Sequence, residues 1–286
     1  MEETGNHSSL VLALANQKGG VGKTTTAVNL GACLAERGVR VLLVDADPQG
    51  NASTGLGSDR STVKIGTYEV LIGQPIEEAL VRTDVENLTL LPSTIDLAGA
   101  EVELVSTFAR EAKLKQALEP MRPHFDVIVV DSPPSLGMLT INALTAADQV
   151  LVPIQCEYYA LEGLGQLLRT IELVREALNP PLRIGGVVLT MFDPRTRLAE
   201  QVVADVRRHF ADAVFQTIIP RTVRLSEAPG FGKPIIRYDG SGKGAAAYRA
   251  LAGEAVLRWF PAHARQNEGD SGSVDDRNMA KESRHE

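Results

Sequence analysis

Residues 10–25 read LVLALANQKGGVGKTT: an apolar run, then a glycine-rich loop, then the polar start of a helical pattern. A strand that passes through such a loop into a helix gathers backbone N–H groups and the positive end of the helix around one point. Gly19, Gly20 and Gly22 permit the positive φ angles that turn these N–H groups inward. The stretch therefore predicts a loop that binds a phosphate group.

Two side chains at the end of the loop extend this prediction to a nucleotide with magnesium. Lys23 can reach the β- and γ-phosphates, and the hydroxyl of Thr24 suits Mg²⁺. The standard motif has glycine five positions before Gly22, where this chain has Gln17, but the backbone geometry of the loop does not depend on that glycine. The predicted nucleotide-binding residues of the loop are Lys18, Gly19, Gly20, Val21, Gly22, Lys23, Thr24 and Thr25.

Two other apolar runs end in carboxylates. Residues 41–44 lead into Asp45 and Asp47, and residues 127–130 lead into Asp131. Burying an unpaired carboxylate is costly, so an acid directly after a buried apolar run indicates that the strand ends at a polar site. Asp45 and Asp47 share a face of an extended chain, so either could hold the water shell of Mg²⁺ or orient an attacking water. Asp131 ends a Walker B-like strand and is predicted to reach Mg²⁺ through water.

The rest of the chain alternates apolar runs with helical patterns, which favours an α/β fold with a doubly wound, mostly parallel sheet and helices on both faces. Continuous apolar runs are typical of strands that are buried on both sides. Strands are expected at residues 10–15, 39–44, 87–91, 127–130, 150–154, 184–191 and 214–219. Helices are expected at residues 23–37, 97–118, 138–147, 161–178, 198–210 and 245–260.

Length and composition indicate one large domain, residues 10–260, between a flexible N-terminus (1–9) and a disordered polar tail (261–286). No apolar stretch approaches the ~20 residues of a membrane-spanning helix. Glu2 and Glu3 stand where a secretory signal carries positive charge. Two cysteines are too few for a disulfide framework, so a cytoplasmic protein is expected.

The formal net charge of −7 is unevenly distributed. Residues 195–249 carry ten basic and five acidic side chains, a local charge of +5 in an acidic protein. This excess allows a basic face that attracts a polyanion. It is equally compatible with ordinary solvated arginines, and charge alone does not separate the two interpretations.

Lys18 is a second lysine in one phosphate loop, placed before the glycines. With it the loop takes the deviant Walker A form, and the chain resembles the ParA/MinD superfamily of ATPases. The stretches DADPQGN (45–51) and DSPPSLG (131–137) carry the same resemblance. QCEYYALEG (155–163) and PRTVRLSEAP (220–229) resemble the chromosomal ParA (Soj) branch in particular. The resemblance covers residues 10 to about 260.

The resemblance implies a P-loop NTPase fold and slow ATP hydrolysis with Mg²⁺. Lys18 would cross the interface of an ATP-bound sandwich homodimer to the partner's ATP. Asp47 would orient the attacking water, with Asp45 nearer the outer shell of the metal. Pro220 and Thr222 would lie beside the adenine, although the branch usually has asparagine at the position of Thr222.

The resemblance also implies partners. The dimer would coat nonspecific double-stranded DNA through Arg195 and Arg224, and a ParB-type protein would stimulate hydrolysis and release it. Guanidinium groups suit contact with the phosphate backbone without reading base sequence. The expected location is the cytoplasm, in association with the nucleoid and not with a membrane.

Three other function classes share parts of this pattern. A MinD-like membrane ATPase needs a C-terminal amphipathic helix, but Val274 and Met279 are the only bulky apolar residues of the tail. A nitrogenase-reductase-like redox protein needs cluster-binding cysteines from two subunits; Cys33 falls in a predicted helix, and Cys156 follows a strand. A small-molecule kinase or ligase would need an acceptor pocket, and nothing in the sequence resembles one.

Overall fold

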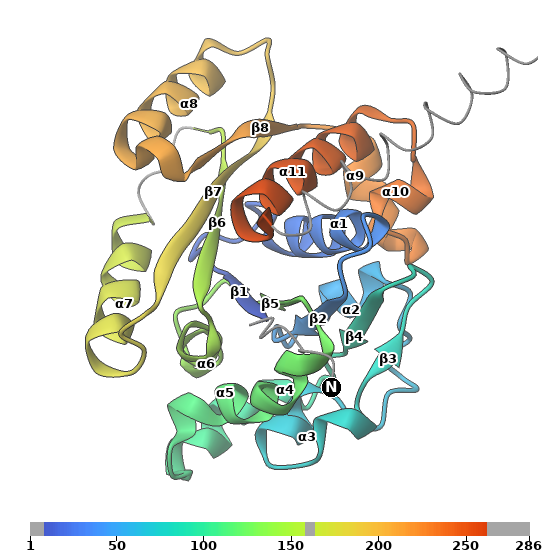
Figure 1. Cartoon of the computed structure of the whole chain (residues 1–286), viewed down its shortest axis with the longest axis vertical. Helices are drawn as coiled ribbons and strands as arrows, with labels where there is room; N and C mark the ends of the chain where they lie inside the picture. The colour runs from blue at the N-terminus through green and yellow to red at the C-terminus, as the bar shows by residue number, and fades with distance from the viewer. Residues whose placement is uncertain (1–8, 158–163, 262–286) are drawn as a thin grey trace, which may run out of the picture.

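The apolar runs of the sequence form one eight-stranded sheet (Figure 1). The computed structural model describes residues 9–157 and 164–261. The strand order is β3-β4-β2-β5-β1-β6-β7-β8, and every neighbouring pair is parallel except β3 and β4. The strands are β1 (Leu10–Leu14), β2 (Val41–Asp45), β3 (Val81–Arg82), β4 (Leu88–Leu91), β5 (Val127–Asp131), β6 (Gln149–Gln155), β7 (Arg183–Phe192) and β8 (Val214–Pro220).

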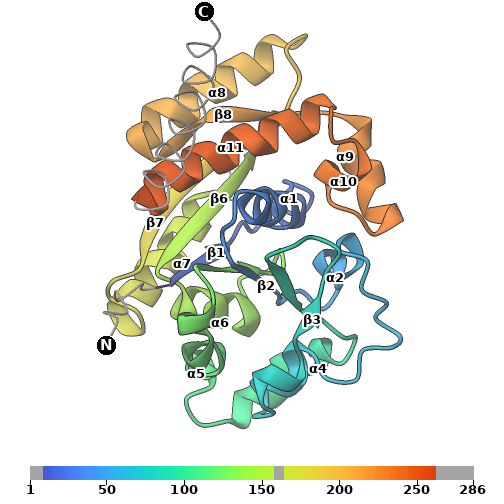
Figure 2. The ribbon, with the colours of Figure 1, turned by 45° about the vertical axis from the view of Figure 1, so that its right-hand side comes forward.

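Alternate residues of the central strands enter two separate cores. In β1, Val11 and Ala13 pack on one face of the sheet, whereas Leu12 and Leu14 pack on the other. The helices α1 (Lys23–Glu36) and α11 (Lys243–Trp259) cover the Leu12 face and lie side by side (Figures 1 and 2). The opposite face is covered by α5 (Lys113–Leu118), α6 (Met138–Ala146), α7 (Leu164–Ala177) and α8 (Arg197–Phe210). The predicted doubly wound fold is confirmed.

The sequence did not predict the shortest elements. They are β3, α2 (Asn51–Gly55), α3 (Thr67–Leu71), α9 (Val223–Glu227) and α10 (Ile235–Tyr238). Five residues or fewer span little more than one helical turn, which is too short for a periodic pattern to be visible. β3 pairs antiparallel to β4 at the edge of the sheet, the one departure from parallel order.

The single helix predicted for residues 97–118 is wrong. The chain forms α4 (Leu97–Glu103), leaves the helix, and starts again at α5. Ala109, at a left-handed φ of 52°, lies in the break. Asn142 of α6 holds the new start, because its side chain accepts a hydrogen bond from the Leu114 amide (3.1 Å) and donates one to the Arg110 carbonyl (2.8 Å). A contact from a distant helix therefore decides where the break falls.

Some predictions lie outside the described residues. They concern the flexible N-terminus (apart from Ser9), the polar tail beyond Pro261, and the first residues of the helix expected at 161–178. The sheet and the helices together extend from Leu10 to Trp259.

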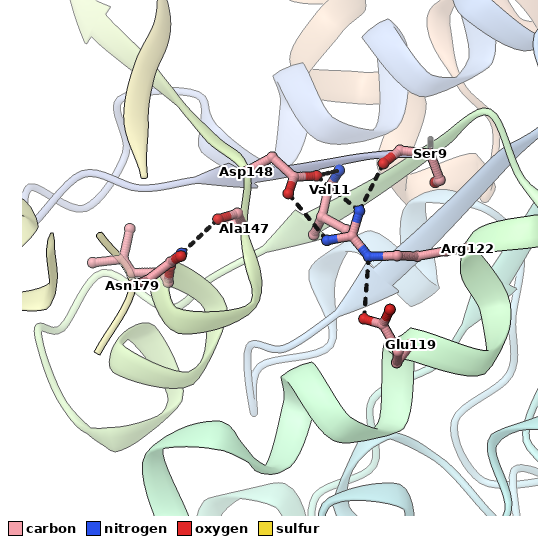
Figure 3. Close-up of polar contacts among 8 residues, drawn as sticks. Ser9, Val11, Glu119, Arg122, Ala147, Asp148 and Asn179 are labelled. Carbon is pink, nitrogen blue, oxygen red and sulfur yellow. Dashed lines mark hydrogen bonds and ion pairs between the residues drawn. The ribbon is translucent and has the colours of Figure 1, made fainter. Parts of the chain in front are cut away.

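The edge of the sheet at which the parallel strands begin, here called the amino edge, is closed by Arg122 (Figure 3). Arg122 donates to the Ser9 carbonyl (2.7 Å) and to both carboxylate oxygens of Asp148 (3.0 and 3.1 Å), and it forms an ion pair with Glu119. Asp148 also accepts a hydrogen bond from the Val11 amide of β1 (2.7 Å). Arg122 thereby joins the chain before β1 to the chain before β6.

Candidate nucleotide-binding site

The glycine-rich loop lies between β1 and α1, at the opposite edge of the sheet, the carboxyl edge. Gly20 and Gly22 adopt left-handed φ angles of 73° and 86°, as a loop that turns its N–H groups inward requires. Gly22 is the residue before α1, so the loop opens at the positive end of a 14-residue helix. This is the geometry of an anion-binding loop.

Two hydrogen bonds fix the loop to the neighbouring strands, and a third lies within the loop. Asn16 donates to the Pro153 carbonyl of β6 (2.7 Å) and accepts from the Lys18 amide (3.0 Å). Thr190 of β7 donates to the Val21 carbonyl (2.8 Å). The sequence alone gives no sign of Asn16 and Thr190, because neither belongs to the motif and their role appears only when the strands are side by side.

Lys23 is 6% exposed and lies at the start of α1. Burial lowers the pKa of its ammonium group, while the nearby carboxylates of Asp131 and Asp47 act in the opposite direction. A phosphate oxygen that approaches the Lys23 ammonium at the end of the loop would be held by charge as well as by the N–H groups.

Asp131 is fully buried at the end of β5, and neither of its carboxylate oxygens has a hydrogen-bond partner within the described residues. Burial raises its pKa well above the usual value, and the charge of Asp45 adds to the rise. The Thr24 hydroxyl, which lies near the carboxylate without meeting the geometry of a hydrogen bond, and the Lys23 ammonium oppose it. Buried polar atoms without a partner are rare and costly. A hydrated Mg²⁺ beside Thr24 would satisfy both oxygens, so the residues present fit this ion.

Asp45 is also fully buried, but its oxygens are engaged. One accepts hydrogen bonds from the amide and the hydroxyl of Ser53 (both 2.7 Å), and the other accepts from the Asp47 amide (3.2 Å). Burial raises its pKa to about 6 against the effect of these donors. Asp45 thus ties β2 to α2, which suits a residue behind the metal shell and not a direct ligand.

Asp47 follows β2 and is 6% exposed. One of its oxygens accepts a hydrogen bond from the Gln49 amide (2.9 Å). No hydrogen bond from the described residues reaches the second oxygen. Of the two acids that the sequence left equivalent, Asp47 is therefore the one with an oxygen available to a water molecule.

A cavity of about 330 Å³ opens beside the loop. It extends from Gly22 and Thr25 to Pro220 and Thr222, the residues expected beside the adenine. The Thr222 hydroxyl accepts a hydrogen bond from the Leu225 amide (3.2 Å) and so caps α9. This bond uses one acceptor position of the hydroxyl, and its O–H group can still donate to a ligand in the cavity.

Met191, at the end of β7, lines the same cavity in a left-handed conformation (φ 53°). A bulky residue rarely adopts this φ, and such strain clusters at functional sites. Met191 was not predicted as a site residue, because an apolar side chain at this position is typical of the last residue of a strand.

The two arginines assigned to DNA are exposed but have acidic neighbours. Arg195 forms two hydrogen bonds with Asp193 (2.6 and 2.9 Å), which lowers the pKa of that carboxyl to about 2. Arg224, on α9, contacts Glu227 at 3.1 Å. Their side chains are 85% and 61% exposed, so a phosphate could share or replace the carboxylate. Exposed pairs of this kind contribute little to stability.

The residues tied to the rival functions give two further observations. Cys33 and Cys156 are buried free cysteines, and within residues 9–157 and 164–261 no group of three His, Cys, Asp or Glu side chains is placed to hold a metal ion. No helix among these residues combines the length and the apolar character needed to cross a membrane.

The chain matches known proteins over most of its length. Residues 9–184 match a family model described as an AAA domain. The chain is 58% identical to the sporulation initiation inhibitor protein Soj of Bacillus subtilis, over 86% of this chain and 98% of that protein. It is 56% identical to the chromosome partitioning protein ParA of Caulobacter vibrioides, over 87% and 94%.

A solved structure with the same fold has bound nucleotide. It is described as cobyrinic acid a,c-diamide synthase from Mycobacterium smegmatis with bound ATP analog and magnesium. The identity is 46%, the TM-score is 0.80, and the match covers 88% of this chain and 96% of that one.

Proposed function

The chain belongs to the ParA/Soj family of chromosome-partitioning ATPases, and we propose that ATP switches it between a free monomer and a DNA-bound sandwich dimer. In this cycle the dimer coats nonspecific double-stranded DNA of the nucleoid, in the cytoplasm. A ParB-type partner then stimulates slow hydrolysis, and the dimer dissociates. The relatives' names support the partitioning role.

The observation that carries the proposal is the loop between β1 and α1, with Lys23 buried within the electrostatic influence of Asp47 and Asp131. In the proposed complex, the loop N–H groups and Lys23 bind the β- and γ-phosphates. The base occupies the cavity that Pro220 and Thr222 line. ATP is thus the ligand that suits both the charge and the shape of the site.

Magnesium would be held by the Thr24 hydroxyl and, through water, by Asp131. When bound, it neutralises charge on the β- and γ-phosphate oxygens. Asp45 keeps α2 and the Asp47 amide in place behind this site. Asp47 then orients a water for attack on the γ-phosphorus, which gives ADP and inorganic phosphate.

Lys18 is the residue that links nucleotide to dimer. It is half-buried, and its ammonium group makes no hydrogen bond or ion pair with the described residues. Because the Lys18 ammonium group has no partner among the described residues of its own chain, it is available to the ATP of a second subunit. This supports the crossed arrangement of the sandwich dimer.

DNA binding follows from the dimer. Arg195 and Arg224 are exposed, and a dimer carries each of them twice. Two weak sites joined in one body bind more tightly than either alone, by about 10²–10⁴-fold where both can engage. The contact is with phosphates, so affinity should be independent of sequence and should fall steeply with salt.

The test is a mobility-shift titration of the purified protein with ATP, ADP or no nucleotide, on two DNA duplexes of unrelated sequence. Tight binding with ATP alone, equal on both duplexes, is the expected result. The matched control is Lys23→Ala, which should bind weakly in all three states. Equal DNA affinity with ATP and ADP would contradict the switch.

The same preparation tests the activity named for the Mycobacterium smegmatis relative. ATP turnover should rise with DNA and a ParB-type protein. Turnover that rises with cobyrinic acid and ignores DNA would support a synthase instead.

A further inference from the structure

Arg60 lies in the loop after α2 and donates three hydrogen bonds, all to backbone carbonyls. The acceptors are Pro48 (2.7 Å), Gln49 (2.5 Å) and Ser93 (3.3 Å). Pro48 and Gln49 directly follow Asp47, and Ser93 lies just beyond β4. The guanidinium group therefore joins the chain after β2 to the chain after β4.

Arg60 differs from the ion-paired arginines elsewhere in the fold. Arg122 and Arg249 also join distant segments, but each has carboxylate partners, Asp148 and Glu36 respectively. Within the described part of the chain, Arg60 forms no ion pair. The two terminal nitrogens of its planar guanidinium group donate to two successive carbonyls, which depends on the geometry of the group more than on its charge.

The segment that Arg60 holds is the turn that carries Asp47. The Gly50 amide donates to the Asp47 carbonyl (2.9 Å), and the Gln49 amide donates to the Asp47 side chain (2.9 Å). The Ser93 hydroxyl donates to the same Asp47 carbonyl (2.8 Å). With Arg60 on the next two carbonyls, three consecutive carbonyl groups of the turn are held by side chains from elsewhere.

Gly50 shows how closely Arg60 covers this turn. It has a left-handed φ of 63°, and a Cβ atom placed there would lie 2.3 Å from Arg60 Nε and 2.5 Å from its Cζ. Only glycine gives both the backbone conformation and the space for the guanidinium group. The position of the Arg60 guanidinium group therefore depends on a glycine at this position of the turn.

We propose that Arg60 is a positioning residue for ATP hydrolysis, which it promotes by holding the Asp47 turn in the orientation that directs the attacking water. The inference rests on the proposed function, in which Asp47 orients that water. Arg60 does not line the cavity that extends from Gly22 to Thr222. Its contribution passes through the carbonyls of Pro48 and Gln49 to the backbone of Asp47.

We expect Arg60 to affect the rate of ATP hydrolysis and not the affinity for ATP. The phosphate-binding groups belong to the loop after β1, which Asn16 and Thr190 fix without help from Arg60. Loss of Arg60 frees the Ser93 carbonyl and two carbonyls of the turn, all of which water can solvate, so the turn can shift while the binding loop stays. Misplacement of a reacting group by about 1 Å costs about 10²-fold in rate.

The experiment compares Arg60→Ala and Arg60→Lys with wild type in single-turnover ATP hydrolysis, with the ATP Kd and the melting temperature measured alongside. Arg60→Ala should hydrolyse ATP about 10- to 100-fold more slowly at unchanged Kd. Arg60→Lys keeps the charge but not the fork, so its rate should be intermediate; if Arg60→Ala does not fold, this variant carries the test. The matched control is Arg122→Ala, at the other edge of the sheet, which should keep the wild-type rate.

A second comparison distinguishes positioning from general stabilisation. In an Asp47→Ala background, Arg60→Ala should have no further effect on the residual rate, because the group that it positions is gone. An equal loss of rate in both backgrounds would overturn the proposal, as would a wild-type rate for Arg60→Ala or a rate loss explained by a weaker ATP Kd. Absence of ATP hydrolysis in the wild type would instead contradict the proposed function itself.

Discussion

The amino edge and the carboxyl edge of the sheet both carry buried or half-buried charged side chains, but these side chains have hydrogen-bond partners at the amino edge and lack some of them at the carboxyl edge within the described residues. At the amino edge Arg122 and Asp148 satisfy each other and the backbone of β1. At the carboxyl edge Asp131 keeps two buried oxygens without a donor among the described residues, and Lys23 loses most of its hydration beside Asp47.

The contrast between the two edges distinguishes structural charge from functional charge. A charged group with its partners in place contributes to stability, whereas one left without partners lowers stability unless a ligand completes it. The carboxyl edge is where ligands of open α/β sheets bind. Removing charge at the two edges should therefore affect different measurements.

The largest effect is expected at Lys23. Lys23→Ala removes the buried cation that faces the β- and γ-phosphates, so ATP binding should fall below detection in equilibrium dialysis. The fold should persist, because the ammonium is a desolvated charge and not a packing group. Lys18→Ala is the control and should retain ATP binding. Retained affinity in Lys23→Ala would contradict the assignment of the carboxyl edge as the nucleotide site.

The next effect concerns catalysis without loss of binding. Asp47→Ala should slow hydrolysis by about 10²–10⁴-fold, because the attacking water loses its orienting group. The protein should then accumulate as an ATP-bound dimer on a sizing column, whereas Lys18→Ala should stay monomeric with ATP. Wild-type behaviour of both variants would exclude the crossed-dimer arrangement.

The sequence predicted the architecture and the phosphate loop for the same reason. Both depend on residues close together in the chain: the apolar run of residues 10–15, the glycines that follow it, and Lys23 at the start of the helix. The buried runs that end in Asp45 and Asp131 similarly identify the edge of the sheet where acids meet. Family and fold are confirmed, and the roles of individual site residues stay predictions.

The contacts that the sequence did not reveal belong to no motif of neighbouring residues. Ser53 binds Asp45, Ser93 binds Asp47, and Arg60 covers Gly50 only after the sheet has formed. A serine in a five-residue helix, a serine after a strand and an arginine in a loop form no pattern from which such contacts can be predicted. The break at Ala109 is similar, because Asn142 fixes it from a different helix.

The third effect lies on the surface beside the carboxyl edge. Arg224→Glu should weaken ATP-dependent DNA binding by at least about tenfold and reduce the salt dependence by about two counterions per dimer. ATP-dependent dimerisation should be unchanged. The matched control is Arg175→Glu on α7, since Arg175 has the same kind of exposed pair, with Glu172 at 3.1 Å. A variant that still coats DNA would move the contact surface away from α9.

The smallest effect is expected at the amino edge, where Arg122→Ala should lower stability and leave the chemistry intact. The change removes hydrogen bonds to the Ser9 carbonyl and to Asp148, and it leaves Asp148 with the Val11 amide as its remaining donor in Figure 3. The side chains of Arg122 and Asp148 are 21% and 40% exposed, so water replaces part of what is lost. The free energy of unfolding should fall by about 1–2 kcal/mol, which corresponds to a fall of about 2–8 °C in melting temperature.

ATP affinity and hydrolysis of Arg122→Ala should match the wild type at a temperature at which both proteins are folded. A lowered ATP affinity without a lowered melting temperature would mean that the two edges of the sheet are coupled. A charged side chain such as Arg122, with all its partners in place, would then have more than a structural role.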